Sequence, residues 1–289
     1  NKMSTEKEVV KKQATEIMVG DLGSLEDFAG QGIENIGIED VKLPFIKCAS
    51  GGTPEINEDD PKYIEGCKVL DIFNNATKSY WPGKKGVLAV PCHYVMTWKE
   101  WSPLGSGSNA PEVIHTDGSI MSQTSRKPAI EKDYKDYLPN GNYILQTPNH
   151  YVLLLDEDYQ PIETGMIVMT STQRKKSKVW NTMITSKKMK SKNGGFFTPA
   201  SWMGVYRLTT VKEKNDMAPQ GWAGWVINFD RMLDQPGDEK TLQAGQKFWQ
   251  DVENFKKMSA NTADKPSVVE PVVEVKKEDA DFIDGKVPF

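Results

Sequence analysis

The chain has 289 residues, 38% of them apolar, and eight tryptophans, which suits one large domain or one domain plus appendages. Its net charge of −4 argues against a uniformly basic nucleic-acid-binding domain, and three cysteines without a CxxC pair argue against a disulfide framework. No apolar run of about 18 residues is present, and the first residues are charged, so we expect neither a transmembrane helix nor a secretory signal.

The first 39 residues predict a helical extension. Val9, Val10 and Met18 lie among Glu and Lys, and Ser24 is a plausible N-cap for a short helical turn. Short or alternating apolar runs bounded by turn residues then predict seven strands. They cover residues 41–49, 69–73, 86–98 with a break near Pro91, 142–155, 165–171, 201–211 and 221–229.

Helical periodicity predicts a helix over 173–184, capped by Thr170, Ser171 or Thr172, and another over 239–258. The segments 102–140 and 187–195 lack such periodicity and predict a long loop and a basic loop. From residue 86 to 229 the order is strand, strand, strand, helix, strand, strand. That is the order of an OB-fold, so we expect a mainly β protein with flanking helices (α+β) built on an OB-like Greek-key barrel.

Four regions follow from this reading. They are a helical extension (1–39), an OB-like DNA-binding domain (40–235), a C-terminal helix (236–258) and a disordered acidic tail (259–289).

The segment 164–212 contains ten lysines and arginines and no Asp or Glu. On the helix expected within it, Val179, Trp180, Met183 and Ile184 share one face, and Arg174, Lys175 and Lys178 share the other. Aromatic residues are interleaved with the cations, a combination that suits single-stranded nucleic acid. A solvated helix face is the alternative for any single run of charge.

We therefore expect phosphate contacts from Arg174, Lys175, Lys178, Lys187, Lys188, Lys190, Lys192 and Arg207. Base stacking is expected from Trp202, Tyr206 and Trp222, with Tyr151 a weaker candidate. Trp180 is expected in the core, whereas Phe196 and Phe197 follow two glycines in the basic loop and fit either role.

The last residues, 279–289, read DADFIDGKVPF. They resemble the C-terminal tip of bacterial single-stranded DNA-binding proteins, in which acidic residues precede a terminal Ile-Pro-Phe. The resemblance implies a partner-binding set consisting of Asp281, Phe282, Asp284, Pro288 and Phe289. A terminal ring would fill an apolar pocket while the acids steer the approach of a polymerase, helicase or primase. Lys286 departs from the pattern, since an acid is usual there.

Several central segments also resemble a family of single-stranded DNA-binding proteins from tailed bacteriophages. The segments are IEDVKLPFIKCASGGTPEI, VLAVPCHYVMTWKEW, MTSTQRKKSKVWNTMI and VYRLTTV, within residues 30–230. Their most specific part is the TSTQ-x-KKS-x-x-WN core at 170–181. The resemblance implies a replication or recombination module acting in the cytoplasm of an infected bacterium.

Enzyme signatures such as the P-loop, GxSxG, HExxH and GxGxxG are missing, and Cys92, His93 and His115 do not have the spacing of a zinc site. The sequence predicts no catalytic activity, no cofactor and no membrane partner. The alternative functions are a recombination mediator or strand-annealing protein and a virion or scaffold component. A nuclease is a third and more distant alternative.

Overall fold

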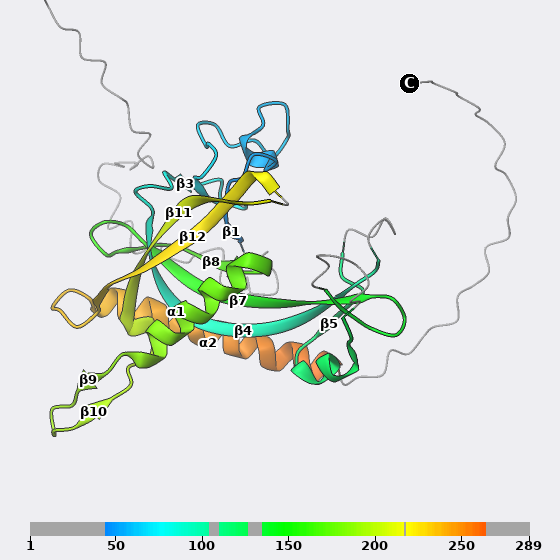
Figure 1. Ribbon diagram of the computed structural model, residues 1–289. Helices are drawn as coiled ribbons and strands as arrows, with labels where there is room; N and C mark the ends of the chain where they lie inside the picture. Colours follow the sequence, from blue (N-terminus) through cyan, green and yellow to red (C-terminus); the bar gives the residue numbers. More distant parts are fainter. Residues whose placement is uncertain (1–43, 104–109, 127–134, 217, 264–289) are drawn as a thin grey trace, which may run out of the picture. The chain divides into compact units, whose positions relative to one another are not determined.

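The computed structural model describes residues 44–103, 110–126, 135–216 and 218–263. Contacts within the chain define two units, Asn1–Val41 and Lys42–Phe289, and every described residue belongs to the second (Figure 1). The predicted N-terminal extension (1–39), and within the predicted tail the residues from 264 onward, lie outside the described residues. No helix in the described ranges is long and apolar enough to cross a membrane.

An antiparallel sheet dominates the described part of the chain. Its strands are β4 (Val87–Trp101), β5 (Val113–His115), β6 (Asp136–Tyr137), β7 (Tyr143–Leu155), β8 (Pro161–Val168), β11 (Gly204–Asn215) and β12 (Ala218–Met232). The order is β12-β11-β4-β7-β6, with β8 paired to β7 and β5 paired to β4. The central pair, β4 and β7, stays in register from Leu88–Leu155 to Trp101–Tyr143, apart from one shift between Pro91 and His93. The break expected near Pro91 is therefore a local irregularity inside one long strand.

Smaller elements surround this sheet. A three-stranded sheet contains β1 (Ile46–Cys48), β2 (Ile72–Asn74) and β3 (Tyr80–Trp81), and a hairpin contains β9 (Met189–Lys190) and β10 (Phe196–Phe197). The α-helices are α1 (Arg174–Ser186) and α2 (Glu239–Ala263). Short 3-10 turns are η2 (Pro54–Ile56), η3 (Gly118–Gln123), η4 (Ser171–Gln173) and η5 (Ser201–Met203). Of the two segments predicted as loops, 102–140 contains β5, η3 and β6, and 187–195 contains β9 and the turn that leads into β10.

The sheet buries apolar side chains on both faces. Because successive residues of a strand point to opposite faces, Val152 and Leu154 of β7 join one core, and Leu153 and Leu155 join the other. Trp180 of α1 belongs to the first core, together with residues of β1 and β2. Phe248 and Val252 of α2 belong to the second. Helices α1 and α2 therefore cover opposite faces of the sheet.

Helix α1 packs through Trp180, which is 0% exposed, with Met183 and Ile184 partly buried beside it. Those three residues follow the predicted apolar face. Val179 does not, because its side chain is 59% exposed. The prediction that Val179 packs on the sheet is wrong, because the narrow stripe centred on Trp180 already fills the contact.

The expectation of a mainly β protein with flanking helices is confirmed, but the described sheet is not closed into the OB-like barrel that was expected. Strands β8 and β12 do not pair with each other, and the segment around β1 makes contacts with both. The amide of Met166 in β8 donates to the carbonyl of Pro44 (2.8 Å). The amide of Ala223 in β12 donates to the hydroxyl of Ser50 (2.9 Å). The segment around β1 thus forms hydrogen bonds with both strands.

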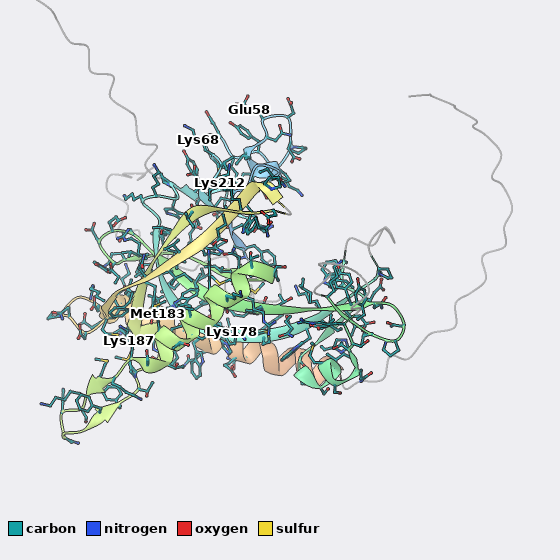
Figure 2. The ribbon with its side chains drawn as sticks, in the orientation of Figure 1. Glu58, Lys68, Lys178, Met183, Lys187 and Lys212 are labelled. Carbon is teal, nitrogen blue, oxygen red and sulfur yellow. The ribbon has the colours of Figure 1, made fainter. Side chains whose placement is uncertain are left out.

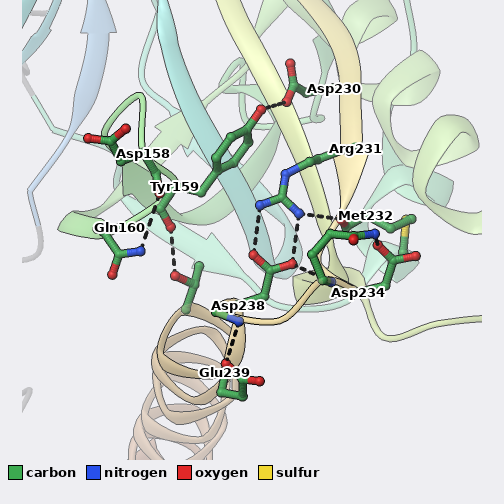
Figure 3. Close-up of polar contacts among 12 residues, drawn as sticks. Asp158, Tyr159, Gln160, Asp230, Arg231, Met232, Asp234, Asp238 and Glu239 are labelled. Atoms are coloured by element: carbon green, nitrogen blue, oxygen red, sulfur yellow. Dashed lines mark hydrogen bonds and ion pairs between the residues drawn. The ribbon is translucent and has the colours of Figure 1, made fainter.

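The N-terminus of α2 is fixed by a polar cluster (Figure 3). The guanidinium of Arg231 makes two 2.8 Å bonds to the carboxylate of Asp238 and lies 3.9 Å from the ring centroid of Tyr159. The hydroxyl of Thr241 donates to the carbonyl of Tyr159 (2.8 Å). Hydrogen bonds from Arg231 hold the pKa of Asp238 below its ordinary value. The cluster therefore ties α2 to the β7–β8 turn and to the end of β12.

Candidate nucleic-acid interface

The solvent face of α1 carries lysines in a row. Lys175, Lys178 and Thr182 are exposed at spacings of three and four residues, so they lie along one side of the helix. Neither Lys175 nor Lys178 forms an ion pair with any residue that the structure describes. Figure 2 shows Lys178 beside α1 and Lys187 at its C-terminal end. We call the side of α1 that carries Lys175, Lys178 and Thr182 the basic face of α1.

A β-hairpin continues the chain directly from α1. Strands β9 and β10 pair in antiparallel fashion, and the turn between them contains Gly194 and Gly195 at φ of +82° and +79°. Such left-handed conformations favour glycine. The amide of Gly194 donates to the carbonyl of Ser191 (3.1 Å), and the amide of Ser191 donates to the carbonyl of Gly195 (3.0 Å). In Figure 1 this hairpin extends away from the sheet.

One face of the hairpin combines cations with an aromatic ring. Phe196 lies directly across from Lys190, and Lys188 lies two residues before Lys190, on the same side. Thr198, two residues after Phe196, lies on the same face. Its hydroxyl accepts a hydrogen bond from the ammonium group of Lys188 (2.6 Å). Phe196 is 76% exposed, and Phe197 on the other face is 44% exposed. Both rings, for which the sequence left a core role open, thus face solvent.

Lys187 sits at the junction of α1 and the hairpin. Its ammonium nitrogen lies 3.1 Å from the centroid of the Phe229 ring in β12, a cation–π arrangement. Lys187 is also half-buried. It therefore holds the base of the hairpin against β12, a role that differs from the phosphate contact expected for it.

A carboxylate anchors the other end of α1. Glu213 forms an ion pair with Lys176 and accepts hydrogen bonds from Gln173 and from the indole of Trp222, both at 3.0 Å. The amide of Trp225 donates to the side-chain oxygen of Gln173 (3.0 Å). Burial raises the pKa of Glu213, but the hydrogen bonds from its partners outweigh burial, and the net pKa lies below the ordinary value. This network uses Lys176 and Trp222 to join α1 to β11 and β12.

A row of rings lies beneath α1. Tyr94, His150, Trp180, Tyr206 and Phe229 follow one another with centroid separations of 5.0, 4.5, 5.8 and 5.6 Å. The His150 Nε2 lies 2.7 Å from the hydroxyl of Ser177. Burial lowers the pKa of His150 to about 3, so its ring is neutral. This row attaches α1 to the sheet and leaves Lys175 and Lys178 facing outward.

Of the expected base-stacking residues, Tyr206 is buried and Trp202 is half-buried. Tyr206 is 1% exposed, since its strand parity points it into the core under α1, so the expectation that it stacks a base is wrong. Trp202 packs on Trp249 of α2, with ring centroids 5.0 Å apart, and joins the core on the opposite sheet face. Trp222 is half-buried and its indole donates to Glu213. The half-buried Tyr151, the weaker candidate, packs against the α2-side core.

Arg207 also lies apart from the basic face of α1. It pairs across the sheet with Leu88, which belongs to the core under α2. Its guanidinium makes bonds of 2.9 and 3.2 Å to the carboxylate of Glu157, and hydrogen bonds from Arg207 hold the pKa of Glu157 below its usual value. A cation so paired has little charge to offer a phosphate. The expected contact from Arg207 is therefore not supported by its position.

The remaining predicted cations come together on α1 and the hairpin. Five exposed lysines form no ion pair within the described ranges: Lys175, Lys178, Lys188, Lys190 and Lys192. Arg174, at the start of α1, is half-buried, and its Nε has no hydrogen-bond partner among the described residues. We call α1's basic face plus the hairpin lysines the basic ridge. The expected partner-binding residues Asp281, Phe282, Asp284, Pro288 and Phe289 lie outside the described residues.

The hairpin is the feature that sequence reasoning missed. Asn193, Gly194 and Gly195 stand between the Lys-Met-Lys and Phe-Phe runs, and a glycine-containing turn between two short runs is a hairpin signal. The runs are only two residues long as strands, which is too short for periodicity to reveal them.

Comparison with known proteins places the chain in a family. No curated protein and no solved structure matches it. The family of Pam3 phage gp34-like proteins matches residues 10–257, which is well over half of the chain. The chain therefore belongs to the Pam3 phage gp34-like protein family, and it is a phage protein.

Proposed function

We propose that this phage protein binds single-stranded DNA during replication or recombination and coats it along the basic ridge. The observation that carries the proposal is the group of five exposed lysines without ion-pair partners in the described structure, arranged on α1 and the adjoining hairpin. Lysines near phosphates release condensed counterions, and that release supplies most of the affinity for nucleic acid of any sequence. The net charge of −4 does not oppose this, because no acid occurs from residue 164 to 212.

The strand connectivity supports the same proposal. Strands β4, β7 and β8 precede α1, and β11 and β12 follow it, with ladders β4–β7, β7–β8, β4–β11 and β11–β12. Single-stranded nucleic acids are common ligands of OB-folds, which are partly open five-stranded Greek-key barrels. The open sheet, with a helix between its third and fourth long strands, is compatible with an OB-like fold of this kind.

The acidic C-terminal tip completes the proposal. Its sequence suits docking on a replication protein, with the Phe289 ring in an apolar pocket and Asp281 and Asp284 steering the approach. Without DNA, the same acids are a competing polyanion for the basic ridge. DNA binding and recruitment of a polymerase, helicase or primase would then be separate activities of one chain.

Charge removal on α1 tests the DNA-binding proposal. In a titration of fluorescent oligo-dT, the double variant Lys175→Gln/Lys178→Gln should bind at least about tenfold more weakly at low salt. Its plot of log affinity against log salt should be shallower by about 1.4, since each lost single-strand phosphate contact removes about 0.7. The matched control is Lys240→Gln/Lys247→Gln, two exposed lysines of α2 on the opposite sheet face.

The control should bind like the unaltered protein. Equal affinities and salt slopes for the two double variants would contradict the proposed role of the basic ridge. If the unaltered protein ignored oligo-dT altogether, an assembly role in the virion would become the better reading of the same surface.

A further inference from the structure

The exposed ring of Phe196 is the feature that the fold leaves unexplained. At 76%, it is the most exposed large hydrophobic side chain among the described residues. Isolated apolar residues are common on surfaces, but a phenylalanine held near the tip of an extended hairpin contributes nothing to either core. Its position suggests a ligand that covers the ring on binding.

The neighbours of Phe196 indicate what that ligand is. Lys190 lies opposite the ring on the partner strand, where Cβ atoms are typically about 5 Å apart, and Lys188 follows on the same face. No acid occurs in the hairpin, and no ion pair within the described ranges uses either lysine. A flat ring flanked by cations that form no ion pair within the described ranges fits a polyanion that itself carries flat rings. An apolar protein pocket would instead leave both ammonium groups unmatched.

The hairpin is also braced so that the ring is presented in a defined place. Lys187 is held over the Phe229 ring, Lys188 is bonded to Thr198, and Pro199 is buried where the hairpin returns to the sheet. The turn is closed by backbone hydrogen bonds between Ser191 and the two glycines. A braced element loses less conformational entropy when it binds.

We infer that Phe196 stacks on a base of single-stranded DNA while Lys188 and Lys190 contact the flanking phosphates. This inference rests on the proposed function. It adds the side chain that would let the protein bind nucleic acid more tightly than a polyanion without bases. Phe196 takes the role expected of Tyr206, which is buried, and of the half-buried Trp202 and Trp222, which already contact Trp249 and Glu213. Stacking on Phe196 is tolerant of sequence, because every base offers a flat face.

The test compares two ligands of equal length and charge, oligo-dT and an oligomer of abasic deoxyribose phosphates. Phe196→Ala should weaken binding of oligo-dT by about fivefold or more and leave binding of the abasic oligomer unchanged. Phe196→Trp should retain the affinity for oligo-dT, and the fluorescence of its new indole should be quenched on binding. The matched control is Phe255→Ala, an exposed phenylalanine of α2, which should bind both ligands like the unaltered protein.

Failures of the two proposals are distinguishable. If the unaltered protein binds neither ligand, the proposed function fails. If it binds oligo-dT and Phe196→Ala binds equally well, only the stacking inference is overturned. Equal losses for oligo-dT and the abasic oligomer would also overturn it, because the ring would then act through the shape of the hairpin. Unchanged DNA affinity with an altered oligomeric state would assign Phe196 to a protein contact.

Discussion

Replacing Trp180 with alanine should weaken the packing of α1 on the sheet. The indole is 0% exposed, stacks on His150 with a centroid separation of 4.5 Å, and meets the edge of Tyr206 at 5.8 Å. No other residue of α1 reaches the core as a fully buried large side chain. Because the lysines of α1 are placed by this contact, the substitution should weaken DNA binding without altering any cation.

The expected cost can be worked from the buried surface. A buried tryptophan removes roughly 150–250 Å² from water, which at about 25 cal/mol per Å² is about 4–6 kcal/mol as an upper bound. Residual compactness of the unfolded chain lowers that figure by about 10–40%. The indole Nε1 has no hydrogen-bond partner in the described structure, so alanine also relieves a desolvated donor. We expect a loss of about 3–4 kcal/mol in the free energy of unfolding.

Urea unfolding followed by circular dichroism measures this loss as a lower midpoint at constant m-value. The matched control is Val179→Ala, the neighbouring residue on the same helix, whose side chain is 59% exposed. It should change stability by no more than about 0.5 kcal/mol. A loss below about 1 kcal/mol for Trp180→Ala, close to that of the control, would refute the packing of α1 described above.

Two further predictions concern pH and the tail. The folded-state pKa of His150 is about 3, below its unfolded value of about 6.5, so the unfolded chain binds the extra proton as pH falls. Lowering the pH from 7 to 5 should therefore reduce the free energy of unfolding by about 2 kcal/mol through this group alone, and His150→Gln should lack this decrease. Parallel plots of unfolding free energy against pH for the unaltered protein and His150→Gln would contradict the prediction. Deletion of residues 264–289, which leaves α2 intact, should tighten oligo-dT binding and abolish capture of the replication protein that binds the tip. Unchanged DNA affinity would count against a competing tail.

The order of the long strands and helices could be predicted from the sequence because each has clear periodicity. The runs predicted at 142–155 and 221–229 correspond to β7 and β12, and Trp225 with Phe229 faces the core as expected. Lys175 and Lys178 of α1 were predicted correctly as solvent-facing because Trp180 defines the packed side of the helix, whereas Arg174, expected on the same side, is half-buried. Local pattern was sufficient to identify the apolar face of α1, although Val179 on that face is exposed.

The burial of individual aromatic side chains could not be predicted in the same way. Whether Tyr206 is buried depends on which face of β11 meets α1, and Trp202 is covered by Trp249, 47 positions later in the chain. Arg207 is neutralised by Glu157, 50 positions earlier. Such long-range partners leave no mark on local periodicity. The open sheet could not be predicted for the same reason, because the segment around β1 that contacts β8 and β12 lies far upstream in the sequence.

The salt dependence of oligo-dT binding by the full chain tests the central claim most directly. If the five free lysines of the basic ridge all contact phosphates, log affinity should fall against log salt with a slope of about −3.5. Binding that is independent of salt, or no binding at about 50 mM salt, would contradict the assignment of the basic ridge to single-stranded DNA.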